Sequence, residues 1–456
     1  MKKILVMILT VAILASAMLI TASAANYEES AAKLNGIGLF RGTDAGFELD
    51  RAPTRAEAVT MLVRFLGLEE ESQSGEYTHP FTDVPNWASD AVAIAYEKGY
   101  TTGVSDTAFN PNGACSAQMY VTFILRALGY SDESVDSTLW EEAIAFGKQI
   151  GVVDDIILSE TFMRGNMTAV SYLALAVPPA DGEYGCLLEK LVADGAVDPD
   201  KAAPILDIFK LLGEFSEIDS DTTKEVSIAM TMAMDMEMTY QGETMPAFMN
   251  LDISMIIDSD NIELAMVMET SVDGENVAME IYVDGSDIYI SAEGQKLKVP
   301  LGEDVGMDIN DLMSMADLGE MADMSGYPIY MVKGLTKASE DGLTAYTFEI
   351  SGGSMTAIVE EVFAMLGGSM GIDSVGDITV GDIAVAYYFD DAGALKRLDM
   401  SIDMSMDVEG SPMSIQMALE CEIIAMGDGV EVKYPDDLDT YMDLEALMAA
   451  MADAAA

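Results

Sequence analysis

The sequence predicts a multidomain protein, in which an all-α region of three repeats precedes an α+β domain, an antiparallel half-barrel whose sheet curves over helices. Before residue 178, apolar residues recur at helical spacing in a unit of about 50 residues that has three copies. From Lys224 onward the period changes to strict alternation, which is typical of strands with one buried face. Two such periods in a chain of 456 residues indicate at least two domains.

The repeat is clearest over 81–130. Its first helix is expected to have Asn86 as N-cap and to end at Gly99, and its second helix to begin at Ser116. Gly, Asp, Asn and Pro residues fill the turn between them. The same order of helix, glycine, turn and helix defines three repeats within a domain at 25–177, with the bounds 27–67, 79–130 and 131–177.

This triplet resembles the S-layer homology (SLH) repeat, on the strings FTDVPNWA, AYEKGYTTG, FNP and TRAE, with FMRGNM as a degenerate trace in the third copy. The resemblance covers about a third of the chain. It implies that the repeats pack as a pseudo-threefold bundle. It also implies non-covalent attachment to secondary cell-wall polysaccharide, of a pyruvylated type, in the wall or S-layer of a Gram-positive-type bacterium.

Composition narrows the location and the partners. Residues 1–24 are expected to be a signal peptide, with Lys2 and Lys3, an apolar run and an Ala-Ser-Ala cleavage site; a membrane anchor is the alternative. No transmembrane segment is expected after its removal. Three scattered cysteines make no disulfide framework. The formal net charge of −57 argues against nucleic acid as a partner, since phosphate binding needs clustered Lys and Arg.

The second half of the chain alternates methionine with small or acidic residues. Met230, Met232 and Met234 share one face of a first long strand, and Met400, Met404 and Met406 share one face of a later strand. Helical interruptions are expected at 310–324 and 354–366, where they could cover the apolar face. The other expected strands are 251–257, 262–270, 277–283, 287–291, 296–300, 327–332, 344–350, 383–389, 398–408 and 413–424.

The predicted sheet domain, 224–442, has a short helical linker before it at 178–223, with a flexible joint at 218–223, and an acidic helical tail after it at 443–456. With YVDGSDIYISAEGQKLKVPL in the middle and VKYPDDL near the end, the domain resembles the LppX/LolA-like lipoprotein carriers. That resemblance implies a half-barrel closed over a cavity for acyl chains. The lipobox cysteine of the family is missing, so the SLH repeats would supply the attachment.

The TRAE string carries the clearest candidate site. Thr54 and Glu57 fit a capping box, which leaves Arg55 unexplained. The resemblance assigns this arginine to an acidic wall sugar, and a guanidinium suits a carboxylate because it offers paired donors in one plane.

Other residues of the repeats complete the predicted wall-binding set. Asp83 and Trp87 could line the same groove; a turn for Asp83 and a core position for Trp87 are the alternatives. In the second repeat Ala117 and Met119 stand where Arg55 and Glu57 stand in the first. Arg164 is the candidate in the third.

The methionine face admits three interpretations: a solid core, a cavity for an acyl chain or other apolar ligand, or Cu(I) coordination by thioethers. Alternation along a strand spreads the sulfurs out, which argues against a metal site. No cofactor or metal is therefore predicted. No enzyme is predicted either, because the sequence has no P-loop, no G-x-S-x-G and no paired zinc-ligand motif, and its single histidine, His79, has no evident Ser or Cys partner.

The sequence thus predicts a cell-surface protein that is attached to wall polysaccharide and displays a β-rich domain able to bind an apolar ligand. The alternative is a purely structural S-layer or envelope component with a solid Met-rich core and no ligand.

Overall fold

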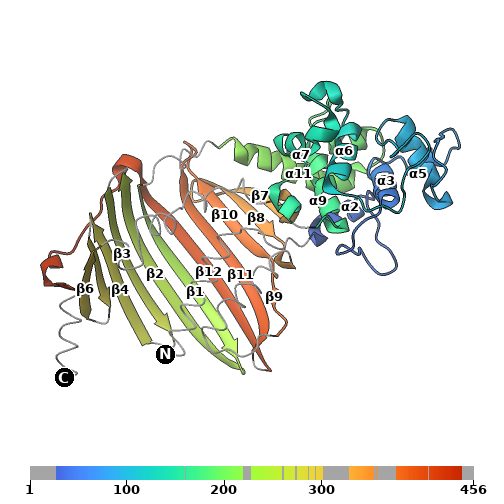
Figure 1. Cartoon of the computed structure of the whole chain (residues 1–456). Helices are drawn as coiled ribbons and strands as arrows, with labels where there is room; N and C mark the ends of the chain where they lie inside the picture. Colours follow the sequence, from blue (N-terminus) through green and yellow to red (C-terminus); the bar gives the residue numbers. More distant parts are fainter. Residues whose placement is uncertain are drawn as a thin grey trace.

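The computed structural model describes residues 27–443 except 160, 219–226, 259–260, 273–274, 286, 293, 301–327, 354–355, 357–375 and 409. Five predictions lie wholly or mostly outside these residues: the signal peptide, the joint after Ile218, the two helical interruptions and the C-terminal tail. The described chain is helical before the joint and consists mainly of strands after it (Figure 1). The predicted order of an all-α region and a curved antiparallel sheet is confirmed.

The helices of the first part follow the predicted repeat order. They are α2 (Glu28–Gly36), α3 (Arg55–Phe65), α4 (Glu69–Ser72), α5 (Asn86–Glu97), α6 (Ala117–Ala127), α7 (Leu139–Gln149), α8 (Asp155–Ser159), α9 (Arg164–Ala176), α10 (Leu187–Ala193) and α11 (Pro199–Ser216). Five of the repeat helices are followed by a glycine with positive φ, a backbone conformation that glycine adopts without a Cβ penalty: Gly38, Gly67, Gly99, Gly129 and Gly151.

Of the three predicted N-caps, two are confirmed by the structure and one is wrong. Thr54 and Glu57 form the predicted capping box of α3, and Ser116 caps α6 by accepting from the backbone N–H of Met119. The prediction for Asn86 is wrong. Asn86 is the first residue of α5 and Pro85, which has no side-chain acceptor, occupies the N-cap position.

The repeats interlock through their turns. The backbone N–H of Arg55, at the start of α3, donates to the carbonyl of Gly113 in the turn of the second repeat (2.8 Å). The backbone N–H of Arg164, at the start of α9, donates in the same way to the carbonyl of Arg51 in the turn of the first repeat (3.0 Å). A helix of one repeat therefore begins against the turn of another, and this creates a seam between each of these pairs of repeats.

The second part is one long, curved sheet (Figure 1). Its order is β13-β6-β5-β4-β3-β2-β1-β12-β11-β10-β8-β7, with β9 paired to β11; β13 pairs parallel with β6 and the other neighbours are antiparallel. The strands are β1 (Ile228–Tyr240), β2 (Glu243–Asp258), β3 (Asn261–Val272), β4 (Glu275–Asp284), β5 (Asp287–Ala292), β6 (Gln295–Pro300), β7 (Val332–Glu340), β8 (Leu343–Ile350), β9 (Thr379–Val380), β10 (Ile383–Phe389), β11 (Leu395–Val408), β12 (Ser411–Met426) and β13 (Met442–Asp443).

One predicted strand is misplaced. The segment expected at 327–332 contains a short 3-10 helix at Ile329–Met331, and the strand itself, β7, runs from Val332 to Glu340. Its sequence, VKGLTKASE, is polar because β7 lies at the edge of the sheet, and apolar content therefore gave no signal for it.

The two parts share one apolar core. Phe215, near the end of α11, packs edge-on against four rings of β8 and β10. At a second contact, Tyr27 lies against Tyr330 (5.6 Å between centroids) and the Lys33 ammonium donates to the carbonyl of Val332. The segment predicted as a linker is helical, and its last helix also joins the repeats to the sheet.

Candidate functional site

Arg55, the first residue of α3, lies inside the seam between the first two repeats and is only 6% exposed. Its guanidinium carbon is 4.6 Å from the centre of the Phe109 ring, and Nη2 donates to Thr101 Oγ1 (3.4 Å) and to the Thr102 carbonyl. Burial lowers the pKa of this guanidinium. Within the described residues it makes no ion pair, and its buried Nε has no hydrogen-bond partner.

Glu57 is fully engaged inside the protein. Its carboxylate accepts from the backbone N–H of Thr54 (2.8 Å) and from both terminal nitrogens of Arg51 (2.9 and 3.1 Å). Burial opposes ionisation, but the hydrogen bonds from Arg51 and Thr54 outweigh it and hold the pKa of Glu57 below its usual value. Its place in the predicted wall-binding set therefore has a structural explanation, the capping box.

Asp83 is exposed, and both of its oxygens accept backbone hydrogen bonds. Oδ1 accepts from Phe109 (2.8 Å) and Oδ2 from Asn110 (2.9 Å), and these bonds hold the pKa of Asp83 below its usual value. The structure thus brings Arg55 and Asp83 to the same turn: the guanidinium packs on the Phe109 ring while the carboxylate fixes the Phe109 backbone.

Trp87 lies on the surface, with 60% of the residue exposed. The alternative that placed it in the core is wrong, because Ala88, Ala91 and Val92 fill the buried positions of this helix. An exposed indole is free to stack on a sugar ring.

Arg164 repeats the arrangement of Arg55 in the seam between the third and first repeats. It is the first residue of α9, is 5% exposed, donates from Nε to the Phe47 carbonyl (3.2 Å) and lies 5.6 Å from the Phe40 ring centre. The first residue of α6 is Ala117. Two of the three repeats therefore place an arginine at the start of their second helix.

The phenylalanines that contact these arginines through a ring (Phe109) or a backbone carbonyl (Phe47) were missed by the sequence reasoning, although a signal was present. Phe47 and Phe109 occupy equivalent turns, each followed by a non-glycine residue with positive φ, Glu48 (52°) and Asn110 (60°). Aligning the turns as well as the helices would have placed both phenylalanines beside the seams.

The predicted apolar face is the inner face of the sheet. Met234, Met400, Met404 and Met406 belong to the main core, with exposures between 3% and 9%. Met230 (3%) belongs to a smaller cluster with Cys421, and Met232 is half-buried between the two.

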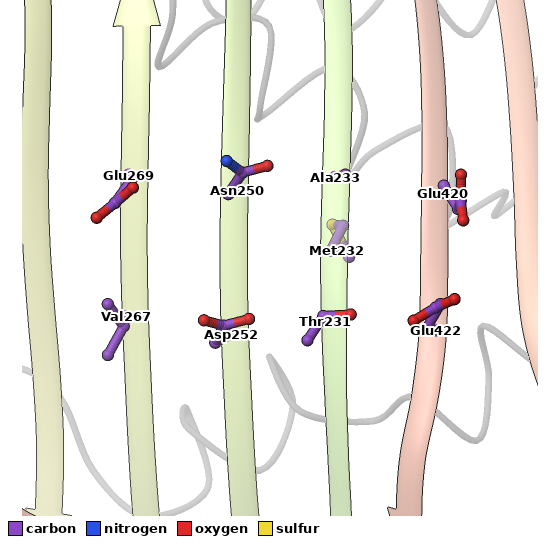
Figure 2. Close-up of a pocket in the computed structure, with 9 residues that line it drawn as sticks. All are labelled: Thr231, Met232, Ala233, Asn250, Asp252, Val267, Glu269, Glu420 and Glu422. Carbon is purple, nitrogen blue, oxygen red and sulfur yellow. The ribbon is translucent and has the colours of Figure 1, made fainter.

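A hollow lies on the face of the sheet opposite these methionines (Figure 2). It has a volume of about 520 Å³, and its walls are Thr231, Met232, Ala233, Asn250, Asp252, Val267, Glu269, Glu420 and Glu422. A second one of about 270 Å³ adjoins it over β10, β11 and β12. Both are shallow, and most of their lining residues alternate with the buried methionines and so lie on the opposite face of the sheet; neither is therefore the predicted acyl-chain cavity. Within the described part of the chain, no three His, Cys, Asp or Glu side chains are grouped as metal ligands.

His79 does have a serine partner, contrary to the sequence expectation. Its Nε2 lies 3.1 Å from Ser89 Oγ, and its Nδ1 accepts from the backbone N–H of Phe81 (3.2 Å). With Nδ1 as acceptor, the neutral ring carries its proton on Nε2 and donates toward the serine. It is therefore unsuited to remove the serine proton as a general base would.

Comparisons with known proteins match the two parts separately. Residues 80–116 match the S-layer homology domain, and residues 216–440 match a family of unknown function, DUF6612. A cell surface protein of Thermoanaerobacter kivui is 29% identical over 195 residues, which are 39% of this chain and 25% of that protein. A surface layer protein of Brevibacillus choshinensis is 31% identical over 132 residues, 28% of this chain and 12% of that protein. The chain thus spans a quarter or less of these curated relatives.

Among solved structures, LprF from Mycobacterium bovis is similar at 16% identity and a TM-score of 0.26, covering 49% of this chain and 97% of that one. A LolA superfamily protein from Nitrosomonas europaea is similar at 11% identity and a TM-score of 0.15, covering 47% and 94%. None of the described helices combines the length and apolar character needed to cross a bilayer.

Proposed function

We propose that this chain, a cell-surface protein that carries an S-layer homology domain, is held non-covalently on a pyruvylated wall polysaccharide by arginines in the seams between its repeats. The observation that carries the proposal is the incomplete set of partners around Arg55. Among the described residues its Nε has no acceptor, and the acceptor of Nη1 is the weak one Met119 Sδ at 3.7 Å. A pyruvyl carboxylate would supply the missing charged acceptor for this guanidinium.

Arg164 supports the same conclusion independently. Its Nη1 also has a thioether as acceptor, Met61 Sδ at 3.7 Å. Both arginines therefore donate to a sulfur where a carboxylate would be the stronger partner. Exposed Trp87 would add an aromatic surface for a sugar ring in the second repeat.

The test is retention of the full chain on isolated walls, measured by co-sedimentation. Because both guanidiniums are buried, truncation to alanine would leave a cavity and lower stability, so Arg55→Lys and Arg164→Lys are the better variants: they keep the charge and lose the planar pair of donors. Arg64→Lys, on the same helix as Arg55 but paired with Glu69 (2.7 Å), is the matched control.

We expect the double variant R55K/R164K to lose most of its retention on walls, and the R64K variant to be retained like the wild type. Walls stripped of pyruvyl groups should bind neither the wild type nor the variants. Undiminished retention of a folded double variant would refute the role of the arginines. Undiminished binding to stripped walls would instead refute the pyruvyl carboxylate as their ligand.

For the sheet, we propose that the inner methionine face receives an acyl chain or another apolar guest. The support is the flexible thioether side chains on neighbouring strands, which adapt to irregular apolar shapes. Native mass spectrometry and organic extraction of the full chain would test this, since α11 packs on the sheet and an isolated 224–442 fragment would lose that helix. A co-purified acyl species is the expected result. Its absence, together with no uptake of added fatty acid, would favour the structural component with a solid core.

A further inference from the structure

Two sulfur atoms from distant parts of the chain meet inside the sheet. Cys421 Sγ, on β12, lies 3.5 Å from Met230 Sδ, on β1, and the two residues are 6% and 3% exposed. They are 191 positions apart in the sequence, and the antiparallel pairing of β1 with β12 brings them together.

The strand register adds further sulfurs around this pair. Cys421 lies directly opposite Met232 on β1, so Met230 and Met234 are its diagonal neighbours on that strand. On its other side Cys421 lies opposite Leu398, which makes Met400 a diagonal neighbour on β11. Opposite residues have Cβ atoms about 5 Å apart and diagonal ones about 7–8 Å, within reach of a methionine side chain. The register thus places four methionines beside Cys421 on one face. Of these, Met230 contacts the thiol and Met232 packs against the same small cluster, whereas Met234 and Met400 belong to the main core.

We propose that this cluster binds Cu(I), with the Cys421 thiolate and the Met230 thioether as ligands and Met232 as the third. Thiolate and thioether sulfurs are soft ligands that select Cu(I), and the set contains no oxygen or imidazole that would favour a harder ion. Two sulfurs at about 2.3 Å from one ion, a length taken from zinc–thiolate bonds, lie roughly 3.5–4 Å apart at angles of about 100–120°. The separation observed here falls in that range.

The chemistry of uptake balances with a single proton. The Cys421 thiol loses its proton, the thiolate bonds to Cu(I), and no electron is transferred. Met232 is half-buried, unlike Met230 and Cys421.

The other two cysteines differ from Cys421 and provide a control. Cys115 is buried, and its Sγ donates to the backbone carbonyl of Ser116 (3.7 Å). Cys186 is buried at the N-cap position of α10. Neither has a described contact between its sulfur and a methionine sulfur, so a general affinity of buried thiols for copper would show equally in all three.

The experiment is an anaerobic titration of the full chain with Cu(I) in competition with a chromophoric Cu(I) chelator, together with near-ultraviolet spectra. We expect one equivalent bound and a thiolate-to-copper absorption band. Met230→Leu conserves core volume and should weaken binding at least tenfold with the fold intact. Cys421→Ala should abolish the band, whereas Cys186→Ala should change neither.

Cys421→Ala separates this site from binding by thioethers alone, because that variant keeps every methionine and loses the thiolate. No stoichiometric binding, or M230L and C421A variants that bind as the wild type does, would each overturn the proposal.

Discussion

Phe215 is the residue on which the junction between the repeats and the sheet depends most directly. Its ring lies edge-on to four aromatic rings, with centroid separations of 5.4, 5.1, 5.6 and 5.7 Å to Tyr346, Phe348, Tyr387 and Phe389. Replacing a fully buried Phe by Ala costs about 3–5 kcal/mol. Phe215 is half-buried, so we expect Phe215→Ala to lower the free energy of unfolding by about 2–3 kcal/mol.

The two tryptophans allow the junction to be assayed specifically. Trp87 and Trp140 are the only ones in the chain and both lie in the helical repeats, so tryptophan fluorescence reports the first part alone. Far-ultraviolet circular dichroism reports helices and strands together. In the wild type the shared core should make the two urea transitions coincide. In Phe215→Ala the sheet should unfold at lower urea than the repeats, so that the transitions separate.

A control lies on the same helix. Phe209 is also half-buried, and the ring contact described for it is with Tyr172 of the third repeat (5.8 Å between centroids). Phe209→Ala should therefore destabilise the chain without the same release of the sheet. If the wild-type transitions are already separate, or if Phe215→Ala shifts neither of them, the shared core does not couple the two parts and this reasoning is wrong.

Three further predictions follow from local contacts. Thr54→Ala removes the cap of α3 and should lower the free energy of unfolding by about 1 kcal/mol in urea titration, and no loss would contradict the capping box. Burial lowers the pKa of Lys33 to about 8 from an ordinary 10.5, so between these values the unfolded chain binds more protons than the folded one. The free energy of unfolding of the wild type should therefore increase relative to that of Lys33→Met as pH rises through that window, by up to about 3 kcal/mol. A difference between the two that does not change with pH would refute this. Hydrogen bonds from Phe109 and Asn110 lower the pKa of Asp83, so its contribution is present above the ordinary value of 3.8 and is lost as pH falls further. Asp83→Asn should make the melting temperature less dependent on pH between about 5 and 2, and an unchanged pH profile would count against this contribution.

The sequence predicted the structure correctly where the spacing of apolar residues along one segment is enough to determine it. A strand turns successive side chains to opposite faces, so alternation alone assigns Met234 and Met404 to the buried face whichever strands become neighbours. The C-terminal ends of helices could be predicted equally well, because helices are followed by a glycine with positive φ at Gly67, Gly99 and Gly129.

The sequence was insufficient where a contact depends on tertiary packing. Nothing local to TRAE indicates that Phe109 and Phe123 will bury Arg55, since both rings come from the next repeat. The proposed Cu(I) site could not be predicted from the sequence for the same reason. Alternation along one strand separates sulfurs, and only the pairing of β1 with β12 brings Cys421 to Met230.

Burial of the arginines also suits the charge of the whole chain. Of its seven arginines, six lie between positions 41 and 164, while the formal net charge is −57. An anionic wall polymer would be repelled by such a surface at long range, although salt at about 0.15 M limits that repulsion to distances of roughly 8 Å. Inside a seam lined by aromatic rings, a guanidinium is screened less and attracts a carboxylate more strongly than it would in water. Under the proposed function, the seams therefore supply an attraction that is local and that the acidic surface cannot cancel.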